Sequence, residues 1–63
     1  MYDQQPPQSI QSVEVVDAMG EWFVFICEGN GEPVVQPFGI ESYARAYAEG
    51  QRIRLGLERF TTI

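Results

Sequence analysis

The sequence predicts an α+β domain, a three-stranded antiparallel meander (β-β-β) with one C-terminal helix packed on one face. The first observation is three short runs rich in β-branched and aromatic residues, at 13–18, 22–27 and 34–38. The second is the glycine-containing punctuation between these runs, which is typical of hairpin turns. The third is a change of the apolar spacing to a helical period from Ile40 onwards.

Length and composition indicate a single small folded unit. The chain has 63 residues and a mass of 7.2 kDa, and 44% of it is hydrophobic, which argues against disorder. Residues 1–11 contain four Gln and a Pro-Pro pair, so we expect a flexible lead-in there. The β-β-β-α domain is expected over 12–57, followed by a C-terminal tail at 58–63.

The two turns set the expected pairing of the strands. Asn30-Gly31 is a strong signal for a type I′ hairpin turn, because both central positions of that turn need positive φ. We treat Met19-Gly20 as a two-residue turn as well. The expected cross-strand neighbours are Val13 with Ile26 and Val15 with Val24 across the first turn, and Ile26 with Val35 and Phe23 with Phe38 across the second.

This pairing assigns each residue of the strands to one face of the sheet. One face then carries Val13, Val15, Trp22, Val24, Ile26 and Val35. The other, mixed face carries Glu14, Val16, Phe23, Phe25, Cys27, Val34, Gln36 and Phe38. A one-residue bulge in either turn would exchange these sets. Pro33 and Pro37 place the third run at an edge of the sheet, because proline cannot donate to a ladder.

The C-terminal part has the pattern of an amphipathic helix. Gly39 is the expected N-cap, Glu41 lies in the first turn, and Gly56 is the expected C-terminal stop. The expected apolar sector contains Ile40, Tyr43, Ala44, Tyr47, Ala48 and Leu55. The alternative is a helix that ends at Gly50 and a fourth strand over 52–57, where apolar residues alternate.

The ionisable residues exclude much enzyme chemistry. Nine acids and four bases give a net charge of −5, and the chain has no Lys and no His. It therefore offers no imidazole as a general base or metal ligand and no amine for a Schiff base. We expect no enzyme activity, no catalytic residue, no cofactor and no metal ion. The single Cys27 cannot close an internal disulfide, which favours a reducing, cytoplasmic location. No apolar run is long enough to span a membrane.

The mixed face is the strongest candidate for a functional surface. A single helix covers one face of a sheet, so apolar side chains on the second face stay exposed in a monomer, and such patches usually mark interfaces. We expect a homodimer that uses this face, with contacts from Val16, Phe23, Phe25 and Phe38, or the edge of the first strand. The alternative is a monomer whose Ile10, Phe60 and Ile63 fold back over the face.

Three arginines of the C-terminal part are candidates for contact with an anion or a partner. These are Arg45, Arg52 and Arg54, and Glu41 is spaced to form an i,i+4 pair with Arg45. Nucleic-acid binding is disfavoured because phosphate contacts need a positive field and the chain is acidic. The sequence thus predicts a small acidic interaction or accessory module with no motif specific to one family. The alternative is a nucleic-acid-linked regulator that acts through the arginines or as an acidic mimic of DNA.

Overall fold

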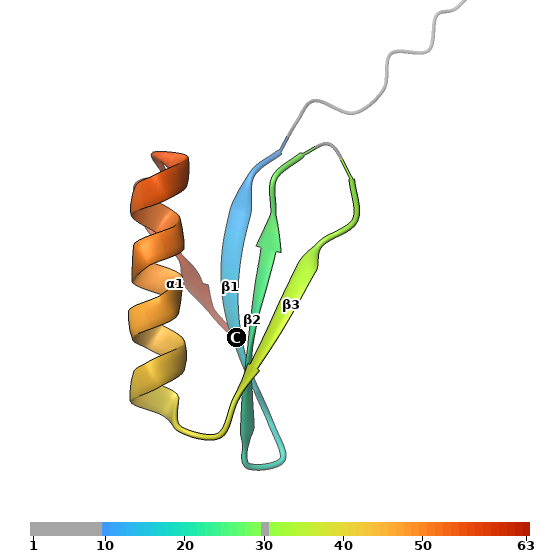
Figure 1. Cartoon of the computed structure of the whole chain (residues 1–63), viewed down its shortest axis with the longest axis vertical. Helices are drawn as coiled ribbons and strands as arrows, with labels where there is room; N and C mark the ends of the chain where they lie inside the picture. Colours follow the sequence, from blue (N-terminus) through green and yellow to red (C-terminus); the bar gives the residue numbers. More distant parts are fainter. Residues whose placement is uncertain (1–9, 30) are drawn as a thin grey trace, which may run out of the picture.

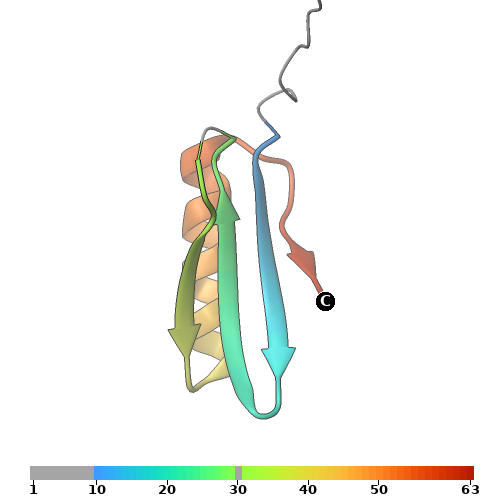
Figure 2. The ribbon, with the colours of Figure 1, turned by 90° about the vertical axis from the view of Figure 1, so that its right-hand side faces the viewer.

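The computed structural model describes residues 10–29 and 31–63 as one sheet with one helix on one of its faces (Figure 1). The elements in chain order are β1 (Ser12–Ala18), β2 (Glu21–Cys27), β3 (Val34–Phe38), α1 (Glu41–Leu55) and β4 (Thr61–Thr62). The strand order is β3-β2-β1-β4. The first three strands are antiparallel, and β4 is parallel to β1 (Figure 2). The predicted α+β meander with a C-terminal helix is confirmed.

The β1–β2 hairpin has the register that the sequence predicts. Val15 pairs with Val24, and the ladder closes at Ala18 and Glu21. Met19 has φ 56° and Gly20 has φ 86°, so both central residues adopt the left-handed conformation of a type I′ turn. This turn has the twist that the two strands need, although methionine is an unusual residue in that conformation.

The predicted register of β3 is wrong by one residue. Val35 pairs with Phe25, not Ile26, and Phe38 pairs with Trp22, not Phe23. The connection is therefore not a two-residue turn centred on Asn30-Gly31, and Asn30 itself lies outside the described residues. A displacement of one residue turns every side chain of a strand to the other face. The residues of β3 that move to the helix side are Val34, Gln36 and Phe38, whereas Val35 moves to the opposite face.

The core lies between the sheet and α1. Val13, Val15, Val24 and Ile26 are buried against two small residues of the helix, Ala44 and Ala48. The alanines let the helix lie close to the sheet, so the valines beneath them are fully covered. Six half-buried residues surround this centre: Trp22, Phe38, Tyr47, Leu55, Leu57 and Phe60.

The helix has the expected extent but a different starting residue. It covers Glu41–Leu55, with Ile40 in extended conformation as the N-cap where Gly39 was expected. Gly56 adopts the left-handed conformation at the C-terminus, and the Leu57 N–H donates to the Arg52 carbonyl at 3.0 Å. This is the pattern of a Schellman cap. The alternative of a strand over 52–57 is therefore wrong.

The face that α1 presents to the sheet is narrower than the predicted apolar sector. Tyr43 is 63% exposed and Ile40 is 51% exposed, so neither contributes to the core. The buried residues of the helix are Ala44 and Ala48. Tyr43 precedes Ala44 by one residue, so its side chain is rotated by about 100° around the helix axis, away from the sheet.

The chain after the helix, where the sequence predicted a C-terminal tail, contains the short strand β4. Thr61 and Thr62 pair with Glu14 and Val15, and the Ile63 N–H donates to the Val15 carbonyl at 2.8 Å. This part of β1 is therefore not a free edge, which removes it from the surfaces expected for edge-to-edge dimerisation. The alternative in which Phe60 covers the mixed face is wrong, because Phe60 packs against the core. Ile10 and Ile63 are exposed.

Candidate protein–protein interface

The face of the sheet opposite α1 is the surface that the fold leaves open. Figure 2 looks onto this face, with the helix behind the sheet. We call it the open sheet face, and alternation along the strands and their register assign its residues. They are Ser12, Glu14, Val16 and Ala18 of β1, Glu21, Phe23, Phe25 and Cys27 of β2, and Val35 and Pro37 of β3. No helix or strand within residues 10–29 and 31–63 lies across it.

Apolar side chains form a continuous group in the middle of this face. Phe25 lies between Glu14 of β1 and Val35 of β3, and Phe23 lies between Val16 and Pro37. The two phenylalanines are half-buried, and Val35 is 45% exposed. Cross-strand neighbours on one face are about 5 Å apart, so these side chains touch as one patch.

Three of the four residues predicted for the interface lie together on this patch. Val16 pairs directly with Phe23, and Phe25 is the next residue of β2 on the same face. Phe38 does not join them, because the corrected register of β3 places it on the helix side, where it packs against the core. Val35 lies on the patch, although the sequence analysis assigned it to the other face. No sequence signal would have placed it there, because Val34 and Val35 are both apolar and alternation does not distinguish the two faces of β3.

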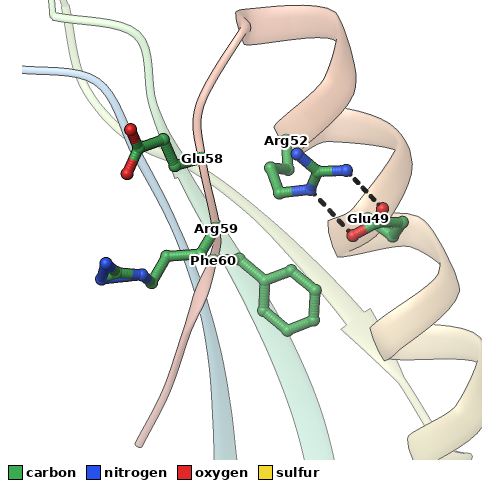
Figure 3. Close-up of a pocket in the computed structure, with 5 residues that line it drawn as sticks. All are labelled: Glu49, Arg52, Glu58, Arg59 and Phe60. Carbon is green, nitrogen blue, oxygen red and sulfur yellow. Dashed lines mark hydrogen bonds and ion pairs between the residues drawn. The ribbon is translucent and has the colours of Figure 1, made fainter.

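Arg52 is one of the residues that line an open hollow of about 370 Å³ at the C-terminal end of α1 (Figure 3). Its Nε donates to Glu49 Oε1 at 2.9 Å, and its Nη1 donates to the Leu57 carbonyl at 2.9 Å. The hydrogen bond from Arg52 lowers the pKa of Glu49 and raises the pKa of Arg52. Through these contacts Arg52 links the last turns of α1 to the segment that follows the helix.

The other two candidate arginines are also paired with carboxylates. Arg45 Nε lies 2.8 Å from Glu41 Oε2, which confirms the predicted i,i+4 pair, and Arg45 Nη1 donates to Thr62 Oγ1 at 3.2 Å. Arg54 Nη2 lies 2.5 Å from Glu28 Oε2. Each arginine that was considered for an anion site therefore has a carboxylate beside it, so these residues present little net positive charge.

The described part of the chain offers no other built site. It contains no group of three Cys, Asp or Glu residues that could hold a metal ion. Cys27 is a half-buried free thiol at the end of β2. No helix within the described ranges is long and apolar enough to cross a bilayer.

Comparison with protein-family models, with curated proteins and with solved structures finds no match to this chain. The open sheet face is therefore interpreted from its own residues and geometry.

Proposed function

We propose that this protein is a small, acidic, non-enzymatic interaction module that acts as a homodimer, in which two copies pack their open sheet faces together. The observation that carries the proposal is the apolar patch of Val16, Phe23, Phe25 and Val35, which no described segment covers. A free thiol on the same face, Cys27, fits a reducing location, and we include the cytoplasm in the proposal.

The size of the core supports a second copy as the occupant. The fully covered centre of one module consists of three valines, one isoleucine and two alanines. Domains below about 70 residues rarely gain enough stability from such a core alone, and self-association is one of the ways in which they compensate. Face-to-face packing would produce four layers, helix–sheet–sheet–helix, with a second core between the two sheets.

The expected gain is comparable with the stability of so small a domain. Burial of roughly 250 Å² of apolar surface per copy contributes on the order of 6 kcal/mol per copy, or about 12 kcal/mol for the pair, before the costs of association. Typical domains have a net stability of about 5–15 kcal/mol. A contact of this size would therefore add substantially to the stability of each folded copy.

No observation among the described residues favours the alternative function, a nucleic-acid-linked regulator. Phosphate binding depends on arginines with an uncompensated charge. Arg45, Arg52 and Arg54 each hold a carboxylate. Acidic mimicry of DNA has no supporting observation among the described residues either.

The experiment that tests the proposal is the mass of the full chain in solution. Sedimentation equilibrium over a wide range of concentrations should give twice the 7.2 kDa of the single chain. A mass of one chain at every concentration, including the millimolar range, would contradict the proposed homodimer.

A further inference from the structure

Arg59 lies at one end of the open sheet face. It precedes β4, and it lines a hollow with Ser12 and Thr61. Thr61 is the neighbour of Glu14 across the β1–β4 pair, so both lie on the open side of the sheet. Arg59 is two residues before Thr61 and points to the same side, away from α1, whereas Phe60 points towards the helix (Figure 3).

Arg59 differs from the other arginines in its pairing. Arg45, Arg52 and Arg54 each form an ion pair with a carboxylate. Within the residues that the structure describes, Arg59 forms none, and it is exposed. A cation beside the open sheet face is thus available to a partner.

Glu21 lies at the opposite end of the same face. It opens β2 and pairs with Ala18, whereas Arg59 lies level with Ser12 at the other end of β1. Glu21 is exposed and also forms no ion pair with a described residue. The apolar patch of Phe23 and Phe25 lies between these two charges. The open sheet face therefore has a base at one end and an acid at the other.

We infer that Arg59 of one copy pairs with Glu21 of the second copy, and that these two symmetric pairs set the orientation of the homodimer. The inference rests on the proposed function. A two-fold axis that runs across the strands brings opposite ends of the two faces together, and it forms both pairs at once. An axis along the strands would instead bring like ends together and leave both charges unpaired. Packed sheets cross at about 30°, and this rotation moves Arg59 at the sheet edge towards the column of β2.

The role of the pairs is orientation more than affinity. Charged pairs at the rim of an interface select the partner and its register, whereas the apolar centre supplies most of the binding free energy. Glu14 is the competing acid, because it lies on the same face, next to Thr61 and closer to the middle. Exchanging the charges of Arg59 and Glu21 distinguishes Glu21 from Glu14 as the partner of Arg59.

The test compares dimer dissociation constants of full-length variants by sedimentation equilibrium. Arg59→Glu and Glu21→Arg each place two like-charged contacts at the rim, and each should weaken the dimer about tenfold. The double variant Arg59→Glu/Glu21→Arg restores both pairs with exchanged charges, and it should recover to within about twofold of the unsubstituted chain. Arg54→Glu is the matched control, because it changes the net charge by the same amount on the helix side and should leave the dimer unaffected.

The outcomes separate this inference from the proposed function. If the unsubstituted chain and Arg59→Glu dimerise equally well, the inference is overturned and the homodimer stands. If the double variant is as weak as the single variants, the Arg59–Glu21 pair is overturned, and Glu14→Arg combined with Arg59→Glu identifies the competing partner by its recovery. If the unsubstituted chain is monomeric at every concentration, the proposed function fails and the inference fails with it. Circular dichroism of each variant, unchanged from the unsubstituted chain, shows that the comparison concerns association.

Discussion

The ring of Phe38 lies with its centroid 5.3 Å from that of Tyr47, and the two ring planes are inclined by 48°. This tilted contact joins the last residue of β3 to the middle of α1, on the covered side of the sheet. It separates Phe38 from Phe23 and Phe25, with which the sequence pattern had grouped it. The phenylalanines of the sheet therefore have two different roles, one in the fold and one on the open surface.

Replacement of Phe38 by Ala should reduce the free energy of unfolding by about 2 kcal/mol, because the change removes a half-buried ring and an aromatic pair. Urea denaturation monitored by circular dichroism measures this difference. Tyr47→Ala and the double variant complete a mutant cycle, in which the coupling should be about 1 kcal/mol. Additive effects of the two changes would contradict a direct contribution of the ring pair.

Replacement of Phe25 by Asp should dissociate the proposed homodimer and leave a folded monomer. Phe25 lies in the middle of the open sheet face between Glu14 and Val35, so an additional carboxylate there would be buried without a partner. Sedimentation equilibrium should show at least a hundredfold weaker association, because about 3 kcal/mol or more is lost.

Tyr43→Asp provides the matched control for this change. Tyr43 is an exposed aromatic residue on the helix side, so the same substitution there should not alter the mass in solution. An unchanged mass for Phe25→Asp would contradict the use of the open sheet face, whatever the result at Tyr43.

The sequence was most informative where short-range turn chemistry and apolar alternation agree. Met19-Gly20 allows a two-residue turn, and the alternation of Val13 and Val15 against Val24 then admits one register, which the structure contains. Gly56 similarly marks the end of α1, because glycine adopts the left-handed conformation of a helix cap without a steric penalty.

The register of β3 could not be obtained from the same rules. Its sequence carries apolar residues at successive positions, Val34 and Val35, so alternation does not distinguish its two faces. The ladder with Trp22 and the packing of Phe38 on Tyr47 decide the register, and both are tertiary contacts. The pairing of Thr61 and Thr62 with β1 is too short to leave a periodic pattern, and it was missed for that reason.

Replacement of Met19 by Asn should stabilise the protein by about 0.5–1 kcal/mol, because asparagine adopts positive φ at a lower cost than methionine. Met19 has φ 56° and its side chain is fully exposed, so the change removes no packing. Thermal denaturation measures the gain. Met19→Ala is the control, since alanine keeps the unfavourable backbone conformation and should not stabilise the chain. Equal stability of the Asn and Ala variants would contradict backbone strain at this turn.

Replacement of Glu49 by Gln should make stability less dependent on pH in the acidic range. The hydrogen bond from Arg52 lowers the pKa of Glu49 in the folded state below its ordinary value of 4.5. A carboxylate with a lowered pKa stabilises the folded state above its unfolded-state pKa, and this contribution disappears as the pH falls through the folded-state pKa. The unsubstituted chain should therefore be more stable than Glu49→Gln at pH 7, and the difference should shrink below pH 4.5. Denaturant titrations at both pH values measure this difference.

Glu58→Gln is the control, because Glu58 lines the same hollow without an ion pair to a described residue. A difference for Glu49→Gln that stays constant with pH would contradict the role assigned to the Arg52 contact.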